Sequence, residues 1–401
     1  MKPIIIIGAG MAGYTAAREL RKLDKEVPIT IITADDGGFY SKPMLSNAYA
    51  QKKLPAQLVT QSATQLAAQI GATILTSTTV SGIDTAAKTL ATSGGVLEYD
   101  KLIFAIGAHP IRLPLQGDAA EQVMSVNHVE HYARFRAVLD ATEAGRQARV
   151  MILGAGLIGC EFADDLAGGG HAVTLIDPNP LPLAALAAPA LSEGLQAALL
   201  ARGVRLCLGT TATRIDRGEK GLKATLANGE TVEADIVLSA VGLRPSTALA
   251  QAAGLKVNRG IVVDAYGQTS AHDVYALGDC AEYTETDGAT RILPYIAPLL
   301  NAGRAIAKTL TGSPTAIDLK PAAVIVKTPC YPLALVPPPQ KALENGRWHT
   351  TEESGRTVCR FIDAQGTVAG FGLSHHEAAS RQVLMSELGK TAATDNTGNA
   401  G

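Results

Sequence analysis

The chain has 401 residues, which is enough for two or three domains, and 47% of them are hydrophobic, a composition typical of globular α/β proteins rather than fibrous or disordered ones. The formal net charge of −2 excludes the basic footprint typical of nucleic-acid binding, and no apolar run is long enough to span a bilayer. The five cysteines form no close pair, so we expect reduced thiols, no bound metal and a cytoplasmic location.

The first predicted element is a buried parallel strand formed by the isoleucine run at residues 4–7. Gly8, Gly10 and Gly13 follow it in the G-x-G-x-x-G pattern of dinucleotide-binding turns. The first glycine allows the turn, the second lets the backbone approach a pyrophosphate, and the third lets helix and strand pack closely. We expect the following loop residues to contact a dinucleotide: Gly8, Ala9, Gly10, Met11, Ala12 and Gly13.

The next strand is predicted at residues 29–33, and Ala34 and Asp35 follow it. A carboxylate at such a strand end accepts hydrogen bonds from a ribose. Ala34 occupies the position where the acid usually lies, so the sequence leaves open which acid binds the ribose. A further strand is predicted within residues 99–110, and it runs into a small-residue turn at 105–107.

The glycine pattern returns at residues 150–159, where an apolar strand precedes Gly154, Gly156 and Gly159. The following strand ends in Asp177, whose carboxylate would accept hydrogen bonds from a ribose 2′-OH and repel a 2′-phosphate. We therefore expect NADH rather than NADPH at this second site. Either glycine pattern alone could be a packing solution, but two strand-flanked copies indicate nucleotide binding.

Three elements are predicted in the following part of the chain. A hairpin turns at Asn228–Gly229, and a strand within residues 269–283 ends at Asp279. Asp279 could hydrogen-bond a polyol such as the ribityl chain of a flavin, or could simply cap a helix. A helix is expected to begin near Ala297, with its positive N-terminal end available to an anion.

The last part of the chain, residues 317–390, alternates short strands with turns and ends in a helix predicted at 377–390. The tail at 391–401 has almost no apolar side chain to bury, so we expect it to be disordered.

Taken together, these motifs resemble the flavoproteins with two dinucleotide-binding domains, which share the glutathione-reductase-like fold. The resemblance rests on both glycine patterns and on the stretches "SAVGLRP", "YALGDCAE" and "VKTPCYPL". It implies an α/β fold with two Rossmann-like domains and a small α+β C-terminal domain. The implied boundaries are a discontinuous FAD-binding domain at 1–112 and 241–316, an NAD-binding domain at 113–240 and a C-terminal domain at 317–390.

The resemblance also implies roles for individual residues. Glu161 matches a family glutamate that pairs with a lysine near flavin N5, and that lysine would be Lys42. The alternatives are a helix-dipole role for Glu161 and an ordinary surface position for Lys42. The further residues implied at the FAD or the nicotinamide are Ala34, Asp35, Val80, Ala105, Gly107, Gly242, Asp279, Ile296 and Lys327.

The region beside the flavin in disulfide-reducing relatives contains no cysteine here, so electrons must leave the flavin directly. Among family members, the chain is most similar to those that oxidise NADH and reduce rubredoxin, with alkane hydroxylation as one downstream use. One alternative is a ferredoxin reductase of an oxygenase system, and another is an NADH-sensing interaction protein. A third is a disulfide reductase that uses Cys160 or Cys280. The oligomeric state is left open.

Overall fold

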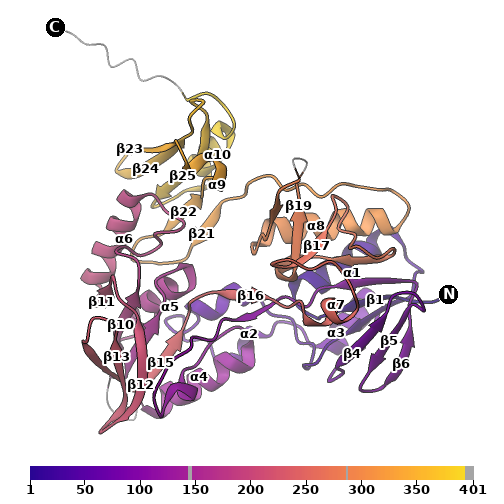
Figure 1. Ribbon diagram of the computed structural model, residues 1–401, viewed down its shortest axis with the longest axis horizontal. Coiled ribbons are helices and arrows are strands. Elements are labelled where there is room, and N and C mark those ends of the chain that lie inside the picture. The colour runs from indigo at the N-terminus through magenta and orange to yellow at the C-terminus, as the bar shows by residue number, and fades with distance from the viewer. Residues whose placement is uncertain (143–146, 286–287, 393–401) are drawn as a thin grey trace.

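A five-stranded parallel sheet forms around the isoleucine strand β1, whose side chains are all buried. β-Branched residues favour this position because both faces of the sheet are covered by other elements. The computed structural model, drawn in Figure 1, describes residues 1–142, 147–285 and 288–392. The strands of this sheet, in spatial order, are β18 (Val274–Ala276), β7 (Lys101–Phe104), β1 (Ile4–Ile7), β2 (Ile29–Ile32) and β3 (Thr73–Leu75).

One strand of this sheet comes from a distant part of the chain, because β18 pairs in parallel with β7. Residues from 1–112 and from 241–316 therefore contribute to a single sheet. The helix α1 packs against α8 on one face of it. The helices of this unit are α1 (Met11–Leu23), α3 (Ala63–Ile70), α7 (Ala248–Ala252) and α8 (Ile296–Leu310). Helix α2 (Pro55–Leu58) comes from the same part of the chain, but its buried Leu58 packs in the core of the second unit.

A four-stranded parallel sheet forms the second unit. Its strands, in spatial order, are β11 (Arg205–Leu208), β10 (Ala172–Asp177), β9 (Arg149–Leu153) and β15 (Ile236–Ser239). A three-stranded antiparallel sheet, β12 (Ala212–Gly218), β13 (Gly221–Leu226) and β14 (Thr231–Ala234), lies beside it. The predicted hairpin at Asn228–Gly229 is confirmed, since β13 and β14 pair across it. The helices of this unit are α4 (Val129–Thr142), α5 (Leu157–Gly168) and α6 (Pro189–Ala201).

The C-terminal part of the chain forms an antiparallel sheet that packs against the second unit (Figure 1). The buried side chains of Leu191 and Leu195 on α6 share one hydrophobic core with Leu333 and Leu335 of this sheet. Its strands, in spatial order, are β21 (Val324–Val326), β22 (Leu333–Val336), β25 (Val368–Ser374), β24 (Arg356–Ile362) and β23 (Arg347–Glu353). Its helices are α9 (Gln340–Leu343) and α10 (Ala378–Glu387).

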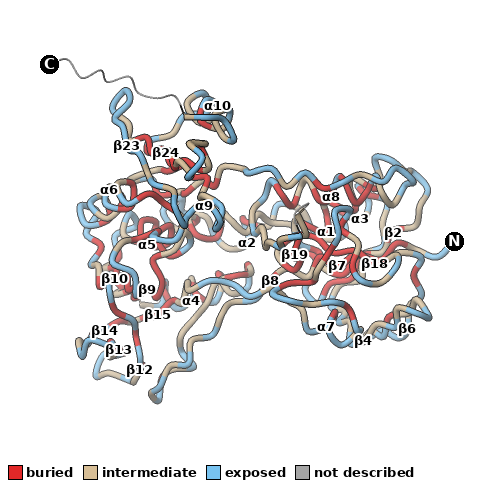
Figure 2. The backbone as a smooth tube through the Cα atoms, turned by 45° about the horizontal axis from the view of Figure 1, so that its top comes forward, coloured by how far each residue is buried: buried red, intermediate tan, exposed pale blue. Residues whose placement is uncertain are grey.

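Two short strands, β8 (Ala108–Pro110) and β16 (Leu243–Pro245), pair antiparallel where the chain passes between the two parallel sheets. Figure 2 shows that the buried residues concentrate in those sheets and in the helices that cover them. The remaining short elements are η1 (Lys42–Asn47), β4 (Val80–Asp84), β5 (Thr89–Thr92), β6 (Gly95–Glu98), η2 (Ala120–Gln122), β17 (Ile261–Val263), η3 (Gly278–Cys280), β19 (Ala281–Thr284) and β20 (Thr290–Arg291).

The predicted α/β class is confirmed, and several predicted element ends move by one to three residues. Strand β2 ends at Ile32, helix α8 begins at Ile296, and the C-terminal helix is Ala378–Glu387. Thr391, predicted to lie in the disordered tail, instead pairs with Thr367. Residues 393–401 of that tail lie outside the described residues. Within the described ranges, no helix is both long enough and apolar enough to cross a membrane.

Candidate active site

A large cavity, with a volume of about 1350 Å³, connects the carboxyl ends of strands in the two parallel sheets. Ile7 at the end of β1 and the following Gly8 line it, and Leu238 and Ser239 line it from β15. Carboxyl strand ends are the usual ligand position in open α/β sheets. The volume exceeds the roughly 300–1,000 Å³ of a pocket for one small ligand, which indicates room for two.

The first glycine pattern has the geometry that the sequence predicts. Gly8 adopts a φ of 111°, and a Cβ atom there would lie 2.3 Å from the Ala105 carbonyl oxygen. A Cβ atom on Gly13 would lie 1.9 Å from the Gly8 carbonyl oxygen. A Cβ atom on Gly10 would meet no atom within 4 Å, so the backbone is open to a ligand there. Gly10 is also the N-cap of α1, and no side chain caps this helix.

The second glycine pattern repeats this geometry at the start of α5. Gly154 has a φ of 104°, and a Cβ atom on Gly159 would lie 1.8 Å from the Gly154 carbonyl oxygen. Gly156 is the open position and the N-cap of α5. The three glycines do not line the cavity, but Leu157 and Ile158 in the first turn of α5 do. Both sites thus present the uncapped N-terminus of a helix, which attracts phosphate.

The two predicted ribose-binding acids differ in their surroundings. Asp35 is exposed and lines the cavity, and its Oδ1 accepts a hydrogen bond from the Gly37 N–H at 3.0 Å. Asp177 lies at the end of β10 and is buried. It accepts hydrogen bonds from the Ala155 N–H at 2.6 Å and from the backbone and side-chain N–H groups of Asn179 at 2.8 Å. A carboxylate has about four acceptor sites, so Asp177 retains capacity for a ribose hydroxyl.

Lys42 and Asp279 place opposite charges on the cavity wall. Burial lowers the pKa of the Lys42 ammonium group, while Asp279 and Asp35 act to raise it. Burial likewise raises the pKa of Asp279, and Lys42 acts to lower it. Within the described ranges the Asp279 carboxylate has no hydrogen-bond partner. Asp279 is half-buried and lines the cavity, so its carboxylate is available to hydroxyl donors of a ligand.

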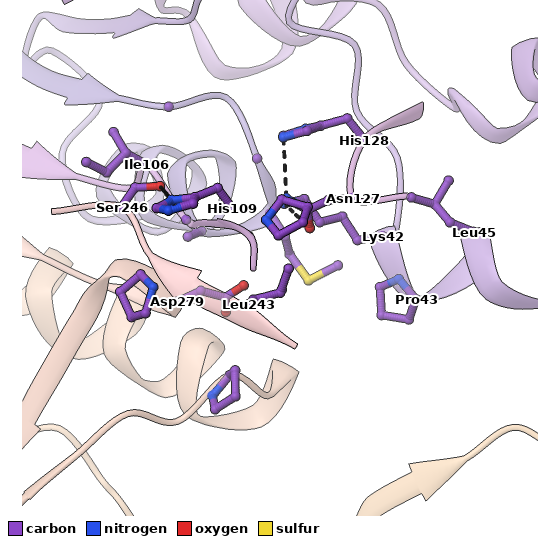
Figure 3. Close-up of a pocket in the computed structure, with 18 of the residues that line it drawn as sticks. Lys42, Pro43, Leu45, Ile106, His109, Asn127, His128, Leu243, Ser246 and Asp279 are labelled. Atoms are coloured by element: carbon purple, nitrogen blue, oxygen red, sulfur yellow. Dashed lines mark hydrogen bonds between the residues drawn. The ribbon is translucent and has the colours of Figure 1, made fainter. Parts of the chain in front are cut away.

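Glu161 pairs with Lys327 rather than with Lys42, so the expected partner is wrong. The Glu161 carboxylate is fully buried, and it binds the Lys327 ammonium group and the Ser46 hydroxyl. Its Oε1 also accepts a hydrogen bond from the Lys327 N–H at 2.9 Å. Lys42 instead approaches Asn127, with Nζ 3.5 Å from Oδ1 (Figure 3). Lys327 and Ser46 line the cavity and Glu161 does not, so Glu161 can act on the cavity only through these two partners.

A polar group beside Lys42 was not identified from the sequence. Figure 3 shows Asn127 and His128 against Lys42 on the cavity wall. Burial, with the nearby charges of Lys42 and His131, lowers the pKa of His128 to about 4, so this imidazole is neutral at pH 7. Asn127 and His128 lie 85 or more residues after Lys42 in the chain. No local sequence motif identifies them as neighbours of Lys42.

The cavity wall within the described ranges contains no cysteine side chain. Cys160 and Cys280, the two thiols considered for a relay, are both buried. Burial raises the pKa of the Cys160 thiol. A helix N-terminus can lower the pKa of a thiol, but burial has the larger effect here. Burial also raises the pKa of Cys280 to about 11. Neither thiol is therefore activated as a nucleophile.

The cavity brings together most of the residues predicted to bind cofactors. The predicted residues that line it are Gly8, Ala9, Gly10, Met11, Ala12, Ala34, Asp35, Lys42, Val80, Ala105, Gly107, Gly242, Asp279, Ile296 and Lys327. The predicted residues that do not line it are Gly13, Gly154, Gly156, Gly159, Glu161 and Asp177. Ile296 begins α8, a helix without a side-chain cap, so backbone N–H groups face the cavity at this end.

Comparison with known proteins gives two family matches. Residues 2–297 match the family described as pyridine nucleotide-disulphide oxidoreductase, and residues 316–388 match the rubredoxin binding C-terminal domain. Together they span both parallel sheets, the cavity and the C-terminal sheet.

Individual relatives cover nearly the whole chain. A rubredoxin-NAD(+) reductase of Acinetobacter baylyi is 41% identical over 97% of this chain and 98% of its own. A rubredoxin-NAD(+) reductase of Alcanivorax borkumensis is 39% identical over 97% of this chain and 99% of its own. The solved structure of a covalent putidaredoxin reductase–putidaredoxin complex matches with a TM-score of 0.86 and 24% identity, covering 97% of this chain and 94% of that one. The last likeness concerns the fold alone.

Proposed function

The chain belongs to the pyridine nucleotide-disulphide oxidoreductase family, and we propose that it is an enzyme that transfers electrons from NADH, through bound FAD, to rubredoxin. The observation that carries this proposal is the match of residues 316–388 to the rubredoxin binding C-terminal domain. That segment contributes Lys327 to the wall of the cavity. The acceptor-binding part of the chain and the electron-transfer cavity are therefore in direct contact.

The residues at the first glycine pattern fit FAD. The open backbone at Gly10 and the uncapped start of α1 suit a pyrophosphate. Asp279, which has no hydrogen-bond partner in the described part of the chain, is suited to accept hydrogen bonds from the ribityl hydroxyls. The N-terminal end of α8 at Ile296 would face the ring and stabilise negative charge on it. When bound, FAD takes up two electrons as a hydride and can release them singly.

The second glycine pattern is where we place NADH. The N-terminus of α5 would receive its pyrophosphate, and Asp177 would bind the ribose 2′-OH and disfavour NADPH. Leu157 and Ile158 would then guide the nicotinamide into the cavity from the α5 side. No side chain need donate or remove a proton in this step, because a hydride passes directly between donor and ring.

Lys42 and Lys327 are the cations that we assign to the flavin edge. Both line the cavity, and a fixed positive charge there favours the arrival of electrons on the ring. Asn127 limits the position of the Lys42 ammonium group, and Glu161 limits that of Lys327. Their side chains come from different parts of the chain, so the positive field exists only in the folded protein.

The second candidate function is a ferredoxin reductase, which the fold of the putidaredoxin reductase complex favours. Steady-state NADH oxidation by the FAD-loaded protein, measured with rubredoxin and with a [2Fe–2S] ferredoxin as acceptor, distinguishes the two candidate functions. We expect kcat/KM to be at least tenfold higher with rubredoxin. We further propose a cytoplasmic location, supported by the five free cysteines and the use of NADH.

A further inference from the structure

Helix α5 carries three buried carboxylates, Glu161, Asp164 and Asp165, and each binds a segment far away in the chain. Asp164 accepts hydrogen bonds from the Cys330 N–H at 3.0 Å and from the Arg202 Nε at 2.8 Å. Asp165 accepts hydrogen bonds from two consecutive backbone N–H groups, those of residues 49 and 50, at 2.9 and 3.0 Å. The family resemblance implies a role for Glu161 alone among these three acids.

Helix geometry explains why these three acids reach two different segments. Successive residues are separated by about 100° around a helix, so Asp164 lies about 60° to one side of Glu161 and Asp165 about 40° to the other. Glu161 in the centre binds both Ser46 and Lys327. Asp165 continues this contact along segment 46–50, and Asp164 continues it along segment 327–330.

One of these segments begins with Lys327, and the other follows Lys42 by four residues, so each lies close in the chain to one of the two cavity lysines. Lys42 opens η1, which packs against α5 and is held by Ser46 and by the backbone at 49–50. Lys327 is held at its own N–H by Glu161, and its segment is held again at Cys330 by Asp164. The same helix begins at the second glycine pattern, so α5 connects the NADH site with both segments.

We propose that Asp165 and Asp164 are positioning residues with separate tasks: Asp165 holds the Lys42 segment against the cavity, and Asp164 holds the Lys327 segment of the C-terminal domain. This inference rests on the function proposed above. Asp165 then governs electron entry at the flavin edge, and Asp164 governs the placement of the rubredoxin-binding domain relative to that edge.

The cost of burial supports a positional role. Taking a carboxylate out of water costs several kcal/mol, and apolar residues of similar volume often stabilise a core as well or better. Hydrogen bonds from N–H groups to a charged acceptor offset that cost and fix their donors in place. Two adjacent buried aspartates with backbone donors from two different segments are therefore expected where the position of those segments matters.

The direct test is hydrogen–deuterium exchange of the FAD-loaded full chain, comparing wild type with Asp165→Asn and Asp164→Asn. We expect Asp165→Asn to increase exchange at residues 42–50 at least tenfold and to leave 327–332 unchanged. Asp164→Asn should show the reverse pattern. Asp216→Asn, which removes a half-exposed carboxylate paired with Arg214 away from both segments, is the matched control and should change neither segment.

A kinetic measurement on the same proteins tests the functional consequence. Stopped-flow reduction of the bound flavin by NADH should slow about tenfold in Asp165→Asn, with the KM for rubredoxin unchanged. Asp164→Asn should raise the KM for rubredoxin about fivefold. Reduction of rubredoxin by the wild-type protein, measured in the same series, tests the proposed function itself. The hydrogen–deuterium exchange pattern does not depend on whether rubredoxin is reduced, so the two proposals can fail separately.

Equal effects of both aspartate variants on both segments, or no effect on either, would overturn the proposal. If an Asn variant does not retain FAD, the Asp→Glu variant at that position replaces it. Glutamate keeps the charge and both acceptor oxygens but displaces them by one methylene group. It should therefore alter exchange in the assigned segment only, and exchange changes in the other segment would contradict the separate tasks.

Discussion

At the scale of single residues, Asp279 provides the clearest test of the FAD assignment. Its carboxylate lines the cavity near the charge of Lys42 and has no hydrogen-bond partner among the described residues. We predict that Asp279→Asn weakens FAD binding about tenfold, because a hydrogen bond to a charged acceptor contributes about 1.5–3 kcal/mol. Two measurements test the FAD affinity of the variant: retention of flavin during dialysis, and fluorescence titration of the apoprotein with FAD. Unchanged FAD affinity would mean that Asp279 does not contact the cofactor.

The thiols give a second prediction at this scale. We expect Cys160→Ser and Cys280→Ser to retain at least half of the wild-type kcat with rubredoxin, because both thiols are buried and their pKa values are raised. Flavin content measured in each variant controls for misfolding. Loss of turnover in a variant that binds FAD normally would indicate a thiol relay.

Asp165 gives a pH prediction. Burial raises the pKa of Asp165 to about 6, against an unfolded value of about 3.9. The folded protein thus binds this proton more tightly than the unfolded chain, so the stabilisation is complete below about pH 4 and is lost as the pH rises through 6. Relative to Asp165→Asn, wild type should lose about 2 kcal/mol of unfolding free energy between pH 4 and 7. Melting temperatures measured across this range test the sign, and a parallel pH dependence in both proteins would contradict it.

At the scale of elements, the glycine turns differ in which cofactor they serve. We predict that Gly159→Ala raises the KM for NADH at least tenfold and leaves FAD content unchanged, because its Cβ would lie 1.8 Å from the Gly154 carbonyl oxygen and displace the start of α5. Gly94→Ala is the control, since its Cβ meets only Thr92 Oγ1 at 3.8 Å. Loss of FAD rather than of NADH affinity would reverse the assignment of the two sites.

The elements that the sequence predicts well are those with local signals. The isoleucine strand and both glycine turns combine apolar runs with residues that only a tight turn requires, and they were located to within a residue or two. The contacts around Glu161 could not be predicted in this way. Ser46 lies 115 residues before it and Lys327 lies 166 residues after it, so only the fold decides which lysine it meets.

At the scale of the whole molecule, the C-terminal sheet and the second parallel sheet share one hydrophobic core through α6. The rubredoxin-binding part of the chain is therefore packed against the NADH side of the cavity rather than attached by a free linker. This arrangement suits direct electron transfer, since the described cavity wall contains no thiol and electrons need leave only across the flavin edge.

The most direct test of the whole account is anaerobic single-turnover transfer. The FAD-loaded protein is reduced with one equivalent of NADH and mixed with oxidised rubredoxin, with a [2Fe–2S] ferredoxin in a parallel reaction. We predict that one such protein reduces two rubredoxins within a single turnover and reduces the ferredoxin at least tenfold more slowly. Faster reduction of the ferredoxin, or no electron transfer to either iron protein, would contradict the account.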